Sequence, residues 1–299
     1  MAPQTANWYP GLMARTRRFL DRHLEHLDLV LEIVDARAPR TCRWHGLVNV
    51  LDGKPSLLIL NKADLADPSV TAAWRRHSID TLGVPAVAAD AVTSGQTARS
   101  QARSLIEAIR GMSDRSQPKR SIKVAALGVP NVGKSSVLNL IGGRHKAKTG
   151  ARPGLTRGQQ WIVLPGGIWL LDLPGVLPPA PRDQDEVAML SLLGILPDGA
   201  FSEVDAAVFL LGFLQASMAH EQLTALLRIG SDAPIVALAE PTALDWLTAW
   251  ALRRGALEAG GRPSLPHAAA MLIAEYRRGG LGRISLERPP VADRQEESE

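Results

Sequence analysis

The chain has 299 residues, of which 45% are hydrophobic and 21% charged, and its formal net charge is +4. This length suits two domains with buried cores, and no run approaches the roughly 18 consecutive apolar residues that a membrane span needs. A lone cysteine, Cys42, excludes an intramolecular disulfide framework, and the N-terminus lacks the apolar core of a secretory signal. We therefore expect a soluble, cytoplasmic, monomeric protein with no membrane contact.

Three short apolar runs, each ending in a polar loop, stand in the N-terminal third of the chain. They cover residues 27–37, 54–64 and 84–90, and they are typical of parallel strands buried on both faces. Helical patterns over residues 71–82 and 97–110 separate or follow them. This alternation predicts a doubly wound α/β domain with a mostly parallel sheet.

The middle of the chain continues this pattern after a polar connector at residues 111–121. A strand, a glycine loop and a helix are predicted over residues 122–142, followed by a hairpin of residues 160–164 and 168–172. After residue 184 only helical periodicity remains, at residues 186–196, 217–229, 242–258 and 266–278. The expected domains are an α/β domain with an N-terminal helical extension (1–178), a helical domain (179–288) and a disordered tail (289–299).

A glycine-rich loop joins the predicted strand to the predicted helix. The sequence "GVPNVGKSS", from Gly128 to Ser136, fits the phosphate-loop pattern in the strand–loop–helix context that this pattern requires. Backbone N–H groups of such a loop surround phosphate oxygens, Lys134 reaches the β and γ phosphates, and the Ser135 hydroxyl ligates Mg²⁺. The residues expected at the nucleotide here are Asn131, Val132, Gly133, Lys134, Ser135 and Ser136.

The sequence "NKAD", Asn61 to Asp64, ends a predicted buried strand, which is where α/β sheets present ligand-contacting residues. An ionised Asp64 can accept from both the ring N–H and the exocyclic amine of guanine, whereas adenine offers no such donor pair on that edge. Together with the phosphate loop, Asn61, Lys62 and Asp64 predict GTP as the ligand and argue against an ATP-using enzyme. Ala91 and Val92 are the candidates for the loop behind the base.

Two further elements suit a nucleotide switch. Asp172, in "DLPG", follows the second strand of the predicted hairpin and would hold Mg²⁺ through a water molecule. Gly175 would bring a backbone N–H to the γ-phosphate. Thr156, in "RPGLT", lies between the phosphate loop and Asp172, where a mobile switch needs a hydroxyl that closes on the metal. The predicted catalytic residues are thus Lys134, Thr156 and Gly175.

The order of these motifs is inverted relative to an ordinary GTPase. The phosphate and switch elements keep their mutual order, and so do the base-recognition elements, but the base-recognition set comes first. Parallel strands joined by helices tolerate new termini at a surface connection, because the strands keep their neighbours. We therefore predict a circularly permuted P-loop GTPase domain, followed by an all-helical C-terminal domain.

The chain resembles the circularly permuted GTPases of the RbgA/YlqF type, which assist assembly of the large ribosomal subunit in bacteria. The similarity covers "NWYPGLMARTRR", "VDARAPR", "LNKADLAD", "GVPNVGKSS", "KTGARPGLTRGQQW", "LLDLPGVL" and "YRRGGLGRISLE". This resemblance implies a GTPase that docks on ribosomal RNA of the large-subunit precursor. It also implies, through Asn131 in the phosphate loop, dependence on a monovalent cation, K⁺, although Asn131 alternatively only shapes the loop.

One position departs from the family pattern. Where family members have a histidine proposed to serve hydrolysis, this chain has Leu12, and Val176 replaces the water-orienting glutamine of small GTPases. Neither side chain orients water, so we predict slow intrinsic turnover that ribosomal RNA or the subunit stimulates. The alternative is a GTP-gated RNA-binding module with negligible hydrolysis.

Basic residues are bunched along the chain, and the sequence pI is near 9.5. Each cluster alone is compatible with a solvated surface, but together they favour an RNA partner. The candidate RNA contacts are Arg15, Arg17, Arg18, Arg277, Arg278 and Arg283.

Overall fold

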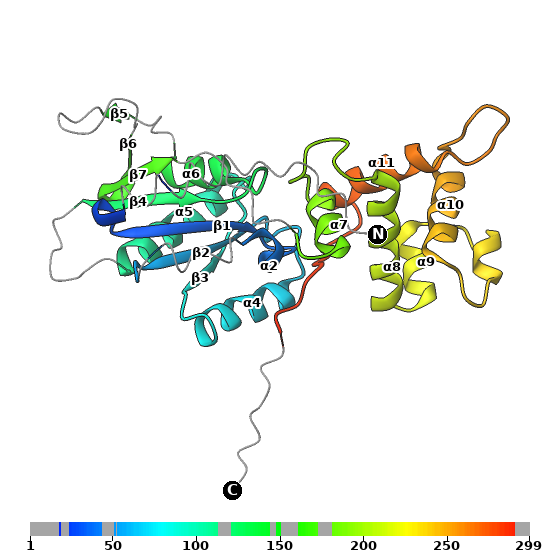
Figure 1. Ribbon diagram of the computed structural model, residues 1–299, viewed down its shortest axis with the longest axis horizontal. Coiled ribbons are helices and arrows are strands. Elements are labelled where there is room, and N and C mark those ends of the chain that lie inside the picture. Colours follow the sequence, from blue (N-terminus) through cyan, green and yellow to red (C-terminus); the bar gives the residue numbers. More distant parts are fainter. Residues whose placement is uncertain are drawn as a thin grey trace, which may run out of the picture.

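The computed structural model describes residue 18 and residues 24–43, 51, 53–112, 121–143, 148–150, 161–172 and 181–290, with the backbone alone at 148–150 and 172. These residues form an α/β domain and a helical domain that lie side by side (Figure 1). Among the described residues, no helix is long and apolar enough to cross a membrane.

A seven-stranded sheet forms the centre of the α/β domain, in the order β3-β2-β1-β4-β7-β6-β5. Neighbouring strands from β3 to β7 are parallel, whereas β6 is antiparallel to both β7 and β5. The predicted hairpin is therefore present as β6 and β7. The strands are β1 (Leu29–Asp35), β2 (Ser56–Asn61), β3 (Ala86–Ala88), β4 (Ile122–Leu127), β5 (Lys148–Gly150), β6 (Trp161–Leu164) and β7 (Ile168–Asp172).

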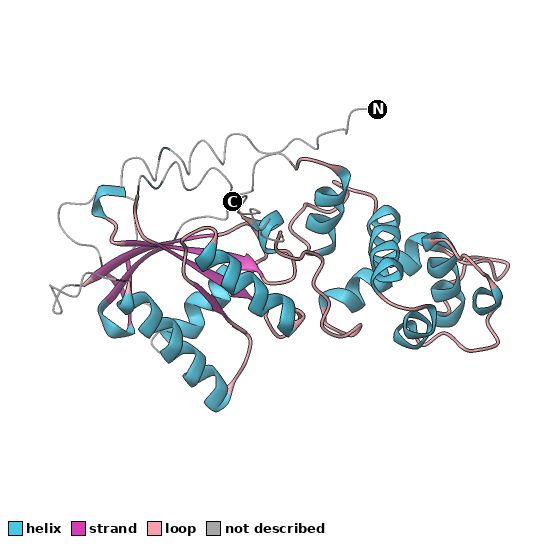
Figure 2. Ribbon diagram, turned by 90° about the horizontal axis from the view of Figure 1, so that it is seen from below, coloured by secondary structure: helices cyan, strands magenta, loops and turns pink. Residues whose placement is uncertain are grey.

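Helices cover the sheet and explain why its central strands are apolar. Every residue of β1 is buried, because the strand lies inside the sheet with packed side chains on both faces. Figure 2 shows the twist of the sheet and the helices beside it. The helical elements of this domain are η1 (Leu24–His26), α2 (Pro39–Cys42), α4 (Pro68–Asp80), α5 (Gly95–Gly111), α6 (Lys134–Gly142) and the turn η2 (Pro165–Gly167).

The sheet order confirms the predicted circular permutation. β4, which leads into the glycine loop, lies in the middle of the sheet between β1 and β7. β2, which ends at Asn61, is the next strand beyond β1 on the side away from β4. Strands that come early in the chain thus complete the sheet around a phosphate-loop strand that comes late. The carboxyl ends of β1, β2, β4 and β7 meet at one edge because these strands are parallel.

The second domain is helical, as predicted. Its helix α8 packs against α7, α10 and α11, and Trp246 and Trp250 of α10 are among the largest fully buried side chains. Its elements are α7 (Gln184–Leu192), α8 (Glu203–Ser217), α9 (His220–Leu227), η3 (Pro234–Ala237), α10 (Ala243–Arg254) and α11 (Leu265–Arg277).

Helix α8 was not among the helices predicted from periodicity. Its sequence is "EVDAAVFLLGFLQAS", in which apolar residues occupy most sides of the helix. Helix α8 contacts four other helices, α7, α9, α10 and α11, so apolar side chains beside its buried face, such as Val208, Phe209 and Phe213, are also partly buried. Its sequence therefore lacks the one-sided apolar stripe of a surface helix. Start signals are nevertheless present: the Ser202 hydroxyl accepts from the backbone N–H of Asp205 and caps the helix.

The two domains are joined at the edge of the sheet where the parallel strands end. Helix α2 packs against α7, and the chain after α11 returns to the α/β domain. We call residues 284–287 the return segment. The backbone N–H of Ile284 donates to the Leu65 carbonyl (3.1 Å), and that of Leu286 donates to the Arg37 carbonyl (2.7 Å). The expected boundaries assign these residues to the helical domain, yet their backbone hydrogen bonds reach the α/β domain.

Glu287 strengthens this junction. Its carboxylate accepts from the backbone N–H of Arg40 (2.9 Å) and from the hydroxyl of Thr41, both at α2. Its backbone carbonyl accepts from the indole N–H of Trp74 on α4 (3.2 Å). Burial raises the pKa of the Glu287 carboxyl, while the hydrogen bonds from Thr41 and Arg40 act in the opposite direction.

Candidate nucleotide site

The phosphate loop has a backbone that only glycine permits at two positions. A Cβ at Gly128 would lie 2.6 Å from the Ile33 carbonyl oxygen of β1. Gly133 has φ +87°, and a Cβ there would overlap the Nδ2 atom of Asn61. Helix α6 begins directly afterwards, at Lys134, so the loop presents the N-terminal end of this helix. The loop therefore forms a cradle that added side-chain atoms would fill.

The base-recognition motif is in direct contact with this loop. The Asn61 amide Nδ2 donates to the Val132 carbonyl (2.7 Å), and the Lys62 ammonium donates to the Asn131 carbonyl (2.7 Å). These bonds join residues 71 and 69 positions apart in the chain. Lys62 and Asn131 both have positive φ values, 59° and 62°. The two motifs with inverted order are thus brought together at one place.

The predicted base-backing loop lies on the other side of Asn61. The Ala91 backbone N–H donates to Asn61 Oδ1 (3.3 Å), so the Asn61 side chain bridges Ala91 and Val132. The side chain of Val92 is 78% exposed, and its backbone N–H donates to Asp90 (3.2 Å). Ala91 is therefore tied to the base motif, and Val92 points to solvent beside it.

One side-chain oxygen of Asp64 is a candidate acceptor for a ligand. Its Oδ1 atom is buried and has no hydrogen-bond partner among the described residues. Burial raises the pKa of the Asp64 carboxyl, and the nearby charge of Asp90 adds to this effect. A buried acceptor without a partner is costly in a folded protein, so it marks a position where a ligand donor fits. The donors of guanine are of the required kind.

The phosphate side of the site is less completely described. Ser135 is exposed and Ser136 half-buried at the start of α6, and Lys134 is half-buried. Asp172 ends β7 in register with Ala126 of β4, so its backbone lies at the edge of the sheet that carries the phosphate loop. Leu12, Thr156 and Gly175 lie outside the described residues. Within the described part of the chain, no group of three or more His, Cys, Asp or Glu side chains could hold a metal ion.

Asn131 also contacts the helical domain. Its side-chain Nδ2 donates to the carbonyl of Gly194, two residues beyond the end of α7 (2.6 Å). The amide proposed as a ligand for a monovalent cation is thus engaged, through its nitrogen, in a contact between the domains.

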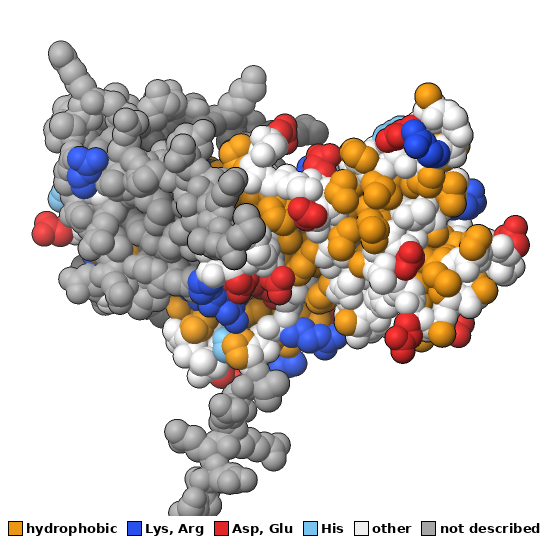
Figure 3. All heavy atoms as spheres, turned by 45° about the vertical axis from the view of Figure 1, so that its right-hand side comes forward, with side chains coloured by type: hydrophobic (Ala, Val, Ile, Leu, Met, Phe, Trp, Pro, Cys, Tyr) orange, Lys and Arg blue, Asp and Glu red, His pale blue; other side chains and the backbone are white. Residues whose placement is uncertain are grey.

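The predicted RNA contacts fall into three groups. Arg277 donates to the carbonyls of Leu192 (3.0 Å) and Ser191 (2.7 Å), so it caps the end of α7. Arg278 pairs with Glu275 at 2.8 Å and is otherwise open to solvent. Arg18 and Arg283 are exposed, while Arg15 and Arg17 lie outside the described residues. Figure 3 shows several Lys and Arg side chains at the lower centre of this face, next to Asp and Glu side chains, and others at its left and right sides.

Two residues at this edge were not singled out from the sequence. Asp35 and Arg37 are 0% and 1% exposed, and the guanidinium binds both carboxylate oxygens of Asp35. The Lys62 ammonium lies 3.0 Å from Asp35 Oδ2. The sequence offered a signal, because Asp35 follows Ile33 and Val34 at the end of a predicted strand, where parallel sheets present ligand-contacting residues. In the structure Asp35 ends β1 opposite Asn61 of β2.

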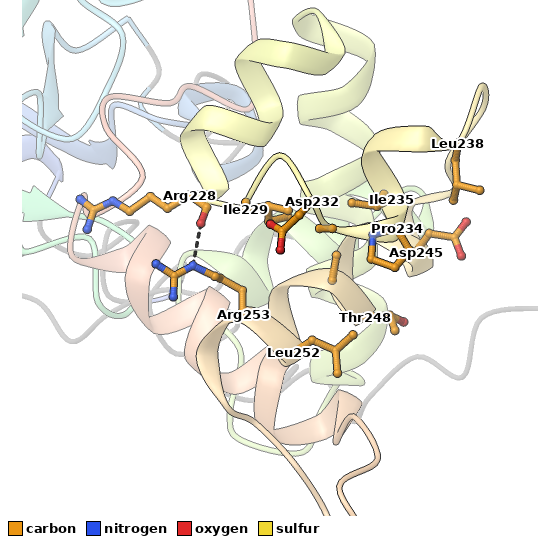
Figure 4. Close-up of a pocket in the computed structure, with 13 residues that line it drawn as sticks. Arg228, Ile229, Asp232, Pro234, Ile235, Leu238, Asp245, Thr248, Leu252 and Arg253 are labelled. Atoms are coloured by element: carbon orange, nitrogen blue, oxygen red, sulfur yellow. Dashed lines mark hydrogen bonds between the residues drawn. The ribbon is translucent and has the colours of Figure 1, made fainter.

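A cavity of about 640 Å³ lies elsewhere, in the helical domain. Figure 4 shows Arg228 and Arg253 at one end of it, where Arg253 Nε donates to the Arg228 carbonyl, and Leu238 and Leu252 on its walls. None of the described residues that line it is a predicted site residue.

Comparisons with known proteins agree with this geometry. The sequence profile of a family described as 50S ribosome-binding GTPase matches residues 123–239. Ribosome biogenesis GTPase A from Bacillus pumilus is 33% identical over 289 residues, covering 95% of this chain and 99% of that protein.

Two solved structures of YlqF have the same overall fold. The GDP-bound form of TM YlqF has a TM-score of 0.64 at 26% identity and covers 91% of this chain and 99% of that chain. The GNP-bound form from T. maritima has a TM-score of 0.62 at 25% identity and covers 92% of this chain and 98% of that chain. The predicted fold and the predicted activity are therefore confirmed: this chain belongs to the ribosome biogenesis GTPase A family and is a GTPase.

Proposed function

We propose that this protein is an assembly factor for the large ribosomal subunit, and that it hydrolyses GTP slowly until ribosomal RNA or the subunit stimulates it. The names of its relatives support a role in ribosome biogenesis, and the matching family profile refers to the 50S subunit. The partner would be the large-subunit precursor with its RNA, met by a monomer in the cytoplasm.

The observation that carries the nucleotide assignment is the contact between the two motifs. Asn61 and Lys62 hold carbonyls of the phosphate loop, and beside them Asp64 offers a buried oxygen that has no partner among the residues the structure describes. We assign guanine recognition to Asn61, Lys62 and Asp64, with Ala91 and Val92 behind the base. The phosphates would bind the backbone N–H groups between Asn131 and Ser136, at the N-terminal end of α6.

For hydrolysis, Lys134 would neutralise charge on the β and γ phosphates, and Gly175 would donate a backbone N–H to the γ-phosphate. Ser135, Thr156 and, through water, Asp172 would hold Mg²⁺, which supplies further neutralisation of the phosphate charge when bound. Asn131 would hold K⁺. K⁺ would bind the side-chain oxygen of Asn131, because its side-chain nitrogen donates to the Gly194 carbonyl in the described state.

Communication with the ribosome would use the junction between the domains. The phosphate loop contacts the helical domain through Asn131, and Arg277 fixes the end of α7 close to that contact. A change at the γ-phosphate would thereby alter how the helical domain is held. Arg278, Arg283 and the arginines near residue 18 would contact RNA phosphates.

Single-turnover GTP cleavage with and without large ribosomal subunits tests this function. We expect slow cleavage by the protein alone and clear acceleration by the large subunit, with no acceleration by the small subunit as the matched control. Binding to large subunits without any acceleration would contradict the proposal and favour the GTP-gated binding module. Equal rates in KCl and NaCl with the subunit present would contradict the K⁺ role of Asn131.

A further inference from the structure

Lys62 is held from two sides. Its ammonium donates to the Asn131 carbonyl of the phosphate loop (2.7 Å) and lies 3.0 Å from Asp35 Oδ2. A lysine has a flexible four-carbon stem and gains a fixed direction only from such partners. The backbone of Lys62, at φ 59°, is also in a conformation that non-glycine residues rarely adopt. The base motif therefore depends on Asp35 for the direction of its lysine.

Both carboxylate oxygens of Asp35 have hydrogen-bond or ion-pair partners. Its Oδ1 accepts from the backbone N–H (3.1 Å) and Nε (2.9 Å) of Arg37, and its Oδ2 accepts from Arg37 Nη2 (2.8 Å) and pairs with Lys62. Burial opposes ionisation of Asp35, but the hydrogen bonds and charges of Arg37 and Lys62 outweigh it and lower the pKa of this carboxyl. Buried ion pairs are weak contributors to stability compared with apolar packing, so stability alone does not explain why charges occupy this place.

Arg37, which binds Asp35, also contacts the helical domain. Its guanidinium lies over the ring of Tyr276 on α11, 4.9 Å from the centroid, and Nη1 donates to the Tyr276 carbonyl (3.5 Å). Its backbone carbonyl accepts from Leu286 of the return segment (2.7 Å). The guanidinium has a fixed planar fork and favours an aromatic face, which makes its orientation depend on Tyr276. Arg37 is buried because these two parts of the chain cover it.

From this geometry we propose that Asp35 and Arg37 are positioning residues for the guanine nucleotide, which hold Lys62 in place only while α11 and the return segment are docked. Nucleotide affinity is then coupled to the position of the helical domain on the base side of the site. This inference rests on the assignment of Lys62 and Asp64 to the nucleotide.

A second buried ion pair on the same strand provides the control. Arg43 Nε and Nη2 donate to Glu32 Oε2 at 2.9 and 2.7 Å, and Glu32 is 3% exposed. Residues three apart on a strand point to opposite faces, so Glu32 and Asp35 project from opposite sides of β1. Glu32→Gln therefore damages a comparable buried pair on the face of β1 away from Asp35 and Lys62.

The experiment measures GDP affinity by fluorescence titration with a labelled GDP, and thermal unfolding of the nucleotide-free full chain. We expect Asp35→Asn and Glu32→Gln to lower the unfolding temperature similarly. Asp35→Asn should also weaken GDP binding by at least about tenfold, the scale of one charge-assisted bond, whereas Glu32→Gln should stay within about twofold. Equal GDP affinity in all three proteins would overturn the proposal.

Two further variants cover the case in which Asp35→Asn does not fold. Arg37→Lys keeps the positive charge but loses the planar guanidinium that binds both oxygens of Asp35. Tyr276→Leu removes the ring beneath this guanidinium and leaves the sequence of the α/β domain unchanged. Both should weaken GDP binding, by roughly threefold to tenfold, at temperatures where the protein is folded. Wild-type affinity in both would show that the helical domain does not act on Lys62.

Comparing guanine with xanthine nucleotides distinguishes the positioning role of Asp35 from the assignment of Asp64 to the base. Asp64→Asn should change the preference from guanine to xanthine nucleotides, because Asp64 accepts from the donor edge of the base. Asp35→Asn should weaken GDP and XDP binding alike, because Lys62 holds the Asn131 carbonyl of the phosphate loop. An Asp64→Asn protein with unchanged base preference would refute the site assignment. A changed preference in Asp64→Asn together with wild-type affinity in Asp35→Asn would refute only the positioning role.

Discussion

The edge of the sheet at β1 and β2 and the core of the helical domain are both tightly buried, but by different means. At the sheet edge, the buried side chains of Asp35 and Arg37 bind each other, and the buried Asn61 side chain donates to the Val132 carbonyl. Lys62, beside them, adopts a rare backbone conformation. Between α8 and α11, the buried side chains are apolar or aromatic, such as Leu210, Trp246 and Trp250. Buried charge and backbone strain are expensive, so they concentrate where a ligand has to be held.

The largest expected effect is on stability, from a substitution in the apolar region. Trp246→Ala removes a fully buried ring that packs against His220 and should lower the free energy of unfolding by about 3–5 kcal/mol. GDP affinity, measured where the variant is still folded, should stay within about twofold, because α10 packs against α8, α11 and η3 of the helical domain. A comparable loss of GDP affinity would mean that the two regions are not separable.

A pair of glycine substitutions compares the regions directly. Gly133→Ala places a Cβ on Asn61 at φ +87° and should weaken GDP binding by about a hundredfold, or roughly 3 kcal/mol. Gly255→Ala, at the end of α10, has a similar φ of +69° but open space around it. It should cost about 1–2 kcal/mol of stability and leave GDP affinity unchanged. Similar GDP affinities in the two variants would contradict the cradle.

The pH dependence of binding should follow Asp64. Guanine binding needs the ionised carboxylate, so affinity is highest above the pKa of Asp64 and falls by about tenfold for each pH unit below it. Because burial raises this pKa above the ordinary 3.8, the fall should begin at a higher pH than for an exposed aspartate. Asp35, with its lowered pKa, stays ionised in this range.

Titration of GDP affinity against pH checks this expectation, and Asp64→Asn is its control. The Asp64→Asn protein should lose the acid-dependent part of the curve, leaving only the titration of the nucleotide phosphates. Superimposable curves for the two proteins would exclude Asp64 as the titrating group.

The smallest effects are expected at the surface arginines. Arg278→Ala and Arg283→Ala should each reduce the salt dependence of ribosomal RNA binding by about one unit on the log–log slope. Arg277→Ala should instead lower the unfolding temperature, because this side chain caps α7. An unaltered slope in the Arg278 and Arg283 variants would remove both from the RNA interface.

The sequence was informative where local patterns carry the chemistry. The phosphate loop, the strand that ends at Asn61 and the hairpin of β6 and β7 each have a short signature with its own physical reason. Their inverted order was enough to predict the permuted sheet, since parallel strands fix which motifs share an edge.

Other features depend on contacts between distant residues and have no local signature. Arg37 and Tyr276 are 239 positions apart, and nothing in either neighbourhood indicates that one covers the other. The bond from Asn131 to Gly194 likewise exists only after the helical domain has docked. Helix α8 was missed for the related reason that burial on several faces removes the periodicity on which prediction depends.

The decisive experiment is a crystal structure of the full chain with bound GDP. We expect the guanine base to donate to the Asp64 carboxylate, whose Oδ1 has no partner in the described part of the chain, while the phosphates lie in the loop from Gly128 to Ser135. A purine ring bound away from Asp64, with its phosphates still in that loop, would contradict it.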